Sequence, residues 1–176
     1  MGQRVDPASC DGAGRRQLAR QGVILQAARA VRIPTLSLIF GYGAMLPLAA
    51  AAVAAWLVTD PWRGLLLRLG VVWAAAVLAF LGGVRRGSSF YTAGGPTLAQ
   101  ILTMLWLFTL AFVALLSGSN GAAIALLTIG YASVAILDPI AARRGEAPAH
   151  FARLRPPQMA VAIMSLLLMA TVVVRS

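Results

Sequence analysis

The sequence contains very few side chains that titrate or bind metals. Among its 176 residues there is no lysine, one cysteine (Cys10), one histidine (His150) and five carboxylates. One cysteine cannot form an intramolecular disulfide or a cysteine-based metal site, and one histidine cannot supply a histidine-based zinc site or a pair of axial haem ligands. We therefore expect a protein without a metal, without a cofactor and without catalytic activity.

Charged residues are scarce as a class. They make up 11% of the chain, whereas 60% of the residues are hydrophobic and the mean hydropathy is +0.82. Soluble domains carry roughly 25% charged residues. Because the apolar residues also come in blocks, the composition indicates an integral membrane protein.

Five apolar blocks are candidates to cross a bilayer, although the fourth is short and must stand upright or draw in its flanks. A helix of twenty residues covers about 30 Å, which is the thickness of the hydrocarbon core. The expected fold is therefore all-α, an integral membrane bundle of about five transmembrane helices in residues 34–176. The spans are expected at about 36–58, 65–83, 97–116, 122–137 and 157–174.

Proline and glycine residues mark the expected ends of these spans. Pro47 lies inside the first span and predicts a kink there. The stretch 80–87, Phe-Leu-Gly-Gly-Val-Arg-Arg-Gly, predicts that the second span leaves the membrane at its glycine pair. Asp138-Pro139 is expected to end the fourth span, and Pro156-Pro157 to begin the fifth.

Residues 1–33 form a polar, basic tail without the apolar core of a signal peptide. Residues 1–14 are expected to be disordered. Residues 15–31 place apolar side chains near one face and arginines largely on the rest, which predicts an amphipathic helix on the membrane surface. The same pattern occurs in mitochondrial transit peptides, so a mitochondrial origin stays open beside the bacterial cytoplasmic tail that we favour.

The distribution of arginine predicts the orientation of the chain. All fifteen basic residues are arginine, and the net charge is +10. With five spans, twelve arginines fall on the side of the N-terminus and three on the other side. Since cytoplasmic loops carry the excess of arginine, we expect the N-terminus inside and the C-terminus outside. No nucleic-acid-binding motif is present, so the expected partners are membrane lipids with anionic head groups at the inner face, and not nucleic acid.

Small residues at four-residue spacing in the second span predict a helix-packing face. Ala75, Ala79 and Gly83 form this ladder. Small side chains let two membrane helices approach closely, so we expect another span to pack against it.

Charged residues at the inner ends of spans two and four form a candidate cluster. Asp138 lies at the membrane boundary, where an arginine neighbour stabilises a carboxylate. We predict an ion pair of Asp138 with Arg85, with Arg86 or with an arginine of its own loop. The cluster is also a candidate patch for an anionic lipid or a protein partner; alternatively its charges are solvated and only fix the topology. The patch consists of Arg85, Arg86, Arg143 and Arg144.

Three stretches resemble one family of small membrane proteins. They are residues 32–47 (RIPTLSLIFGYGAMLP), residues 73–87 (WAAAVLAFLGGVRRG) and residues 136–157 (ILDPIAARRGEAPAHFARLRPP). The first is a proline-entered span, the second a span that ends in Phe-Leu-Gly-Gly, and the third a loop with an aspartate and arginines before the last span. On these residues the chain resembles domain-of-unknown-function family 3429 over about residues 32–174.

The resemblance implies a multi-span helical protein of an inner membrane, related to an animal mitochondrial transmembrane protein. It implies no catalytic residues. The family typically has a histidine or similar residue and a tryptophan where this chain has Arg85-Arg86, so a role that rests on those two residues does not carry over.

These observations together predict a non-enzymatic accessory or assembly subunit of an inner-membrane complex. The ladder offers a packing face, and the sequence holds no recognisable catalytic set. The alternative is a small-molecule or lipid carrier that acts as an oligomer, which broken helices in corresponding halves would favour. The expected location is the bacterial inner (plasma) membrane, with the mitochondrial inner membrane as the alternative.

Overall fold

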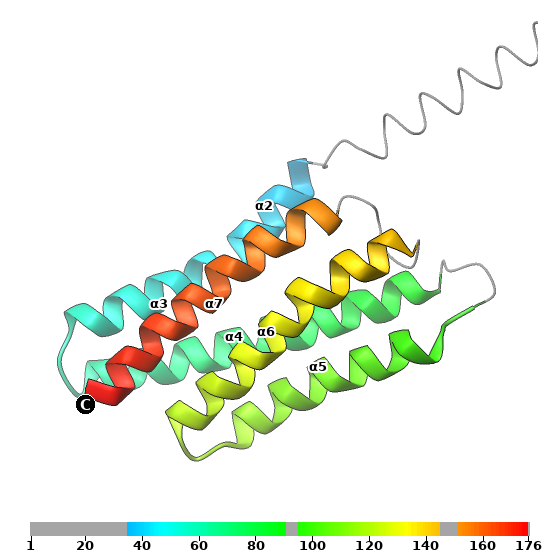
Figure 1. The fold of residues 1–176 in the computed structure, drawn as a ribbon. Helices are drawn as coiled ribbons and strands as arrows, with labels where there is room; N and C mark the ends of the chain where they lie inside the picture. The colour runs from blue at the N-terminus through cyan, green and yellow to red at the C-terminus, as the bar shows by residue number, and fades with distance from the viewer. Residues whose placement is uncertain (1–34, 91–94, 145–150, 176) are drawn as a thin grey trace, which may run out of the picture. The chain divides into compact units, whose positions relative to one another are not determined.

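The structure is a computed structural model that describes residues 35–90, 95–144 and 151–175. The chain divides between Ile33 and Pro34, and all described residues belong to the part that follows. The basic tail, with the surface helix expected at 15–31, lies outside the described residues, as do Glu146 and His150. All regular elements of the described part are α-helices (Figure 1).

Five stretches of these helices are long and apolar enough to cross a membrane, which confirms the expected all-α fold. The first span combines two short helices, and each later span is a single helix. In chain order the helices are α2 (Thr35–Gly43), α3 (Leu46–Leu57), α4 (Trp62–Ser89), α5 (Leu98–Leu116), α6 (Asn120–Arg143) and α7 (Phe151–Arg175).

The first span is interrupted at Ala44 and Met45, just before Pro47, where the sequence predicts a kink. Where α2 ends, the Met45 N–H donates to the Tyr42 carbonyl at 2.9 Å and closes a tight turn. Pro47 stands in the first turn of α3. A backbone N–H at that position has no partner within the helix in any case, so the proline costs little there.

Two further helices continue beyond their expected ends. α4 runs past the glycine pair at 82–83, and α6 runs past Pro139 to Arg143. The extra turns carry side chains that neighbouring helices bury: Asp138 is 4% exposed and Ala141 is 7% exposed. Tertiary contacts outweigh the local preference of glycine and proline to end a helix, so both helices run on past their expected ends.

The last helix begins earlier than expected. α7 starts at Phe151, five residues before Pro156, and both prolines lie inside it. Leu154 and Arg155, which precede the prolines, are 4% and 8% exposed. Their burial holds the first turn in place, and this turn carries residues that matter for the site described below.

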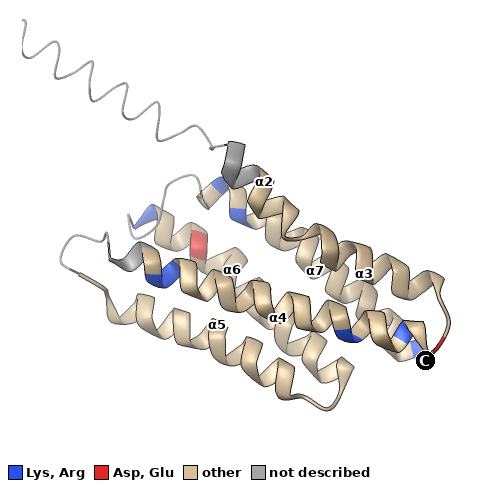
Figure 2. Cartoon of the chain, turned by 180° about the vertical axis from the view of Figure 1, so that it is seen from behind, with Lys and Arg blue, Asp and Glu red and all other residues tan. Residues whose placement is uncertain are grey.

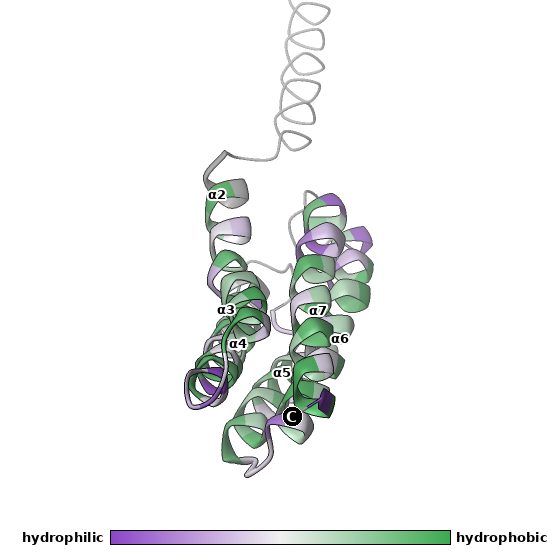
Figure 3. Cartoon of the chain, turned by 90° about the vertical axis from the view of Figure 1, so that its left-hand side faces the viewer, coloured by the Kyte–Doolittle hydropathy of each residue, from purple (hydrophilic) through white to green (hydrophobic). Residues whose placement is uncertain are grey.

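The central helix pair of the bundle is α4 and α6. α4 packs on α3, α5 and α6, while α6 packs on α5 and α7, and α7 closes the bundle against α3 (Figures 1 and 3). Tyr131 of α6 is fully buried and donates its hydroxyl to the Ala74 carbonyl of α4 at 2.8 Å. Beside it, a methyl group on Gly130 would overlap the Leu78 side chain. The absence of a side chain at position 130 therefore leaves room for the buried Leu78 side chain between the two helices.

The small-residue ladder of α4 packs only in part. Ala75 is fully buried, and Ala79 is half-buried against the core. Gly83 is exposed, and a Cβ built there would meet no described atom within 4 Å, so no described helix packs against this position. Its neighbour Gly82 packs instead, because a Cβ there would lie 3.4 Å from the Met104 carbonyl oxygen of α5.

The outer surface of the bundle is apolar between two charged ends. Large hydrophobic side chains are exposed on every span, and the arginines of the described residues gather at the two ends (Figures 2 and 3). This is the distribution that a bilayer requires. We call the end that contains the starts of α2 and α7 and the ends of α4 and α6 the Asp138 end.

Candidate functional site

Asp138 is the buried charge around which the candidate site is built. It lies near the end of α6 and is 4% exposed. Its Oδ1 lies 2.7 Å from Arg85 Nε of α4, and its Oδ2 lies 3.2 Å from Arg155 Nε of α7. One carboxylate therefore ties three helices together, with one oxygen for each arginine.

The two arginines bind Asp138 differently. Arg85 donates a hydrogen bond through Nε to the carboxylate, which makes a strong, charge-assisted contact. Arg155 Nε lies within ion-pair distance, but its N–H is not directed at the oxygen, and within the described residues this nitrogen makes no hydrogen bond. The Arg155 guanidinium carbon lies over the Phe151 ring, 4.5 Å from the ring centre, which is a cation–π contact.

Gln158 lies one turn after Arg155 on the same side of α7. It is 1% exposed, and its Nε2 has no hydrogen-bond partner among the described residues. The residue that faces this nitrogen is Gly41 of α2, where an added methyl group would overlap the Gln158 amide. The glycine thus makes room for a buried amide that the protein itself leaves unsatisfied.

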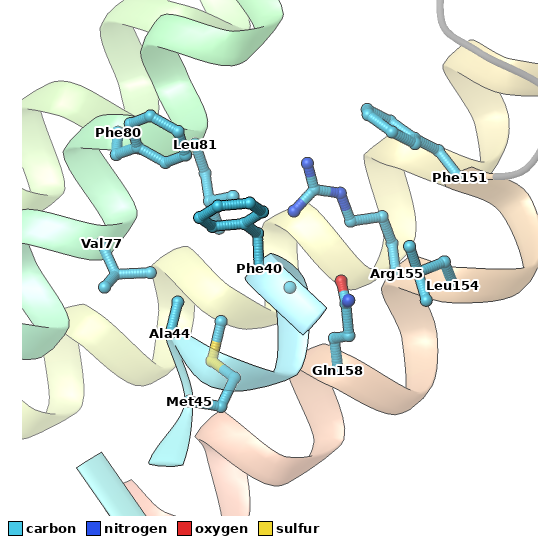
Figure 4. Close-up of a pocket in the computed structure, with 11 residues that line it drawn as sticks. Phe40, Ala44, Met45, Val77, Phe80, Leu81, Phe151, Leu154, Arg155 and Gln158 are labelled. Atoms are coloured by element: carbon cyan, nitrogen blue, oxygen red, sulfur yellow. The ribbon is translucent and has the colours of Figure 1, made fainter. Parts of the chain in front are cut away.

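Arg155 and Gln158 supply the polar groups of a cavity of about 150 Å³ between the first span, α4 and α7 (Figure 4). The remainder of the lining is apolar. Phe40 and Phe80 are 74% and 68% exposed, so they form the rim where the cavity opens to the surroundings of the bundle. The other lining residues are Gly41, Ala44, Met45, Val77, Leu81, Phe151 and Leu154.

The four arginines of the expected patch do not act alike. Arg85 points toward Asp138 and forms one of the two ion pairs described above. Arg86 is half-buried, and its guanidinium lies 4.4 Å from the centre of the Phe90 ring. Arg143 and Arg144 are exposed at the end of α6. The patch is thus divided into an ion-paired Arg85, a half-buried Arg86 and two exposed charges on α6.

Arg155 is one of the loop arginines that the sequence offered as partners of Asp138, but the sequence did not single out Gln158, Gly41 or Phe40 as site residues. The spacing of Arg155 and Gln158, three residues apart, would place both on one helix face. This spacing predicts a shared helix face only if the helix begins before Pro156. Because the helix was expected to begin at Pro156-Pro157, Arg155 was placed in a loop. Gly41 and Phe40 lie far away in sequence, so only the packing of α2 on α7 brings them to the site.

The opposite end of the bundle holds a second, more open cavity of about 220 Å³. There the Arg175 guanidinium carbon lies 4.3 Å from the centre of the Trp56 ring, and Arg63 donates two hydrogen bonds to the Val58 carbonyl. Asp60 lies 3.9 Å from Arg63 but is 69% exposed, so this pair is solvated. The described residues contain no group of three or more histidine, cysteine or acidic side chains that could hold a metal.

Five apolar helices around a buried charge cluster define a multi-pass helical membrane protein. The chain belongs to the family described as protein of unknown function (DUF3429), whose model matches residues 33–171. Asp138, Arg155 and Gln158 all lie within that match. Searches of curated proteins and of solved structures found no match.

Proposed function

We propose that the protein binds a membrane amphiphile in the cavity at the Asp138 end and performs no chemistry on it. One observation carries the proposal: Gln158 lines an apolar cavity, and its buried amide nitrogen has no hydrogen-bond partner among the described residues. Leaving such a group unpaired away from water costs about 1–3 kcal/mol. An occupant with an acceptor oxygen removes that cost.

The shape of the cavity supports the same class of ligand. Its polar groups, on Arg155 and Gln158, lie on α7, and its rim carries the exposed rings of Phe40 and Phe80. A ligand that places a polar head against α7 can pass an apolar tail between these rings into the surrounding hydrocarbon. Head and tail of this kind define an amphiphile.

A small-molecule or lipid carrier is the role that this site favours. The break in the first span lies at the cavity, since Ala44 and Met45 of the turn line it. Broken helices commonly form the binding sites of membrane carriers, because unwound backbone and helix ends are available there to a ligand. In this proposal the cavity faces the cytoplasmic leaflet of an inner membrane, as the distribution of arginine predicts.

An accessory or assembly subunit of an inner-membrane complex is the second candidate. Gly83 and Gly87 lie one turn apart on the exposed side of α4, with open space around both among the described residues. Such a pair lets the helix of a partner membrane protein approach closely. Co-purification with one larger complex at fixed stoichiometry, after extraction in mild detergent, would favour this role; a lone or self-associated chain would favour the carrier.

Native mass spectrometry of the extracted protein tests the binding proposal. The wild-type protein should retain an amphiphile, and Ala44→Phe, which fills the cavity, should lose most of it. Ala125→Phe adds the same side chain to an exposed position of α6 away from the cavity and should retain the ligand. Equal retention by all three proteins would contradict the proposal.

A further inference from the structure

We infer that the cavity recognises an amphiphile with an anionic oxygen head group, a phosphate or a carboxylate, through Arg155 and Gln158. This inference rests on the proposed function and adds the chemical class of the head group. It also moves the expected anion site from the exposed arginines at the helix ends to a cavity between the first span, α4 and α7.

The charge of Arg155 is only partly compensated by Asp138. The carboxylate divides its oxygens between two guanidinium groups, at 2.7 Å for Arg85 and 3.2 Å for Arg155. The longer contact is the one without a directed N–H. A guanidinium stays protonated at all physiological pH values and carries five N–H donors. Arg155 therefore has both charge and donor capacity left for a second anion.

The position of Arg155 directs that capacity into the cavity. Its guanidinium projects from α7 into the space between Phe40 and Phe151, and the Gln158 amide projects into the same space from one turn further along (Figure 4). The Phe151 ring holds the guanidinium from one side, with its centre 4.5 Å from the guanidinium carbon. Asp138 and Phe151 thus limit the positions that the guanidinium can take up.

The combination of the two side chains selects an anionic oxygen over a neutral one. A neutral carbonyl can accept the Gln158 N–H. It does little, however, to balance the positive charge of Arg155 that Asp138 leaves uncompensated in a low-dielectric site. A phosphate or carboxylate offers several acceptor lone pairs and a negative charge, so it can accept from both side chains. The apolar lining then requires that the anion carries a tail.

The test is a binding series on full-length protein that has been stripped of lipid in detergent. The probes are phosphatidylglycerol, oleate, the neutral lipid diacylglycerol and inorganic phosphate, read by native mass spectrometry and by tryptophan fluorescence. We expect phosphatidylglycerol or oleate to bind at least about tenfold more tightly than diacylglycerol. Tighter binding of phosphatidylglycerol identifies a lipid phosphate as the head group, and tighter binding of oleate identifies a carboxylate. Inorganic phosphate should bind far more weakly than either, because it has no tail.

Two variants connect the binding to the named side chains. Gln158→Leu keeps both ion pairs of Asp138 and should weaken the anionic amphiphile about tenfold. Arg155→Gln removes the charge and should abolish the preference for anionic over neutral heads. Because Arg155→Gln also breaks an ion pair, its thermal unfolding is measured beside its binding, and Arg144→Gln at the exposed end of α6 serves as the matched control.

The outcomes separate this inference from the proposed function. The head-group assignment is overturned if diacylglycerol binds as tightly as the anionic probes. It is also overturned if Arg155→Gln keeps the full preference for anionic probes. Either result leaves the proposal of amphiphile binding intact. Equal loss of preference in Arg144→Gln would place the anion on the exposed charges and also overturn it. Failure of every amphiphile to bind overturns both.

Discussion

At the scale of single residues, the Asp138 carboxylate decides how the charged end of the bundle is organised. It accepts from Arg85 and pairs with Arg155 while it is 4% exposed. A buried ion pair contributes little net stability compared with an apolar substitute, but the loss of one partner leaves an uncompensated buried charge. The removal of a single charge here should therefore be costly.

We predict that Asp138→Asn destabilises the protein by about 3–5 kcal/mol, because two guanidinium groups lose their shared carboxylate. Thermal unfolding in detergent, followed by tryptophan fluorescence, measures the effect. The matched control is Asp60→Asn, whose carboxylate is 69% exposed and 3.9 Å from Arg63, with an expected change of about 0–1 kcal/mol. Equal melting temperatures for the two variants would mean that the buried pairs contribute nothing.

A second prediction at this scale concerns the glycines of α2. Gly41→Ala places a methyl group where the Gln158 amide lies, so it should displace that side chain and lower amphiphile retention several-fold. Gly43→Ala adds the same methyl group two residues later, where no described atom lies within 4 Å, and should behave as wild type. Retention measured by native mass spectrometry compares the two; unchanged retention in Gly41→Ala would show that the amide does not contact the ligand.

At the scale of the elements, the close approach of α4 and α6 holds the centre of the bundle. Small residues permit this approach, and the hydroxyl of Tyr131 adds a hydrogen bond to the Ala74 carbonyl across it. Local patterns in the sequence identify small residues but do not say which of them meet a neighbour. Gly130 packs against a neighbouring helix and Gly83 is exposed, so substitutions at these two positions measure how much packing at a small residue contributes to stability.

We predict that Gly130→Ala destabilises the protein by about 1–3 kcal/mol, because the new methyl group overlaps the buried side chain of Leu78. Gly83→Ala should be neutral or slightly stabilising, since its methyl group meets no described atom and alanine favours the helix. Unfolding in detergent ranks the variants. A larger loss in Gly83→Ala than in Gly130→Ala would contradict the described packing.

At the scale of the whole molecule, the arginine count predicts which side of the membrane carries the cavity. Twelve arginines belong to the side of the N-terminus when the chain crosses five times. The Asp138 end lies on that side, because α4 and α6 end there and α7 begins there. We therefore expect the cavity in the cytoplasmic leaflet.

Cysteine labelling in intact cells checks this orientation. In a Cys10→Ala background, Gly118→Cys, in the turn between α5 and α6, should react with a membrane-impermeant maleimide, because it is expected outside. Arg144→Cys, at the end of α6, should react only after the membrane is opened. The reverse pattern would place the cavity in the outer leaflet, and equal labelling of both positions would contradict the five-span topology.

The sequence by itself determined the class of this protein, because it contains five stretches that are apolar enough, and about long enough, to cross a membrane. It also pointed to an ion pair of Asp138 with Arg85, Arg86 or an arginine of its own loop, since a boundary carboxylate needs a cation. Only the tertiary structure decided that the helices continue through Pro139 and begin before Pro156, because burial by neighbouring helices outweighs local preference. For the same reason only packing could unite Gly41 with Gln158, since their contact joins chain segments more than a hundred residues apart.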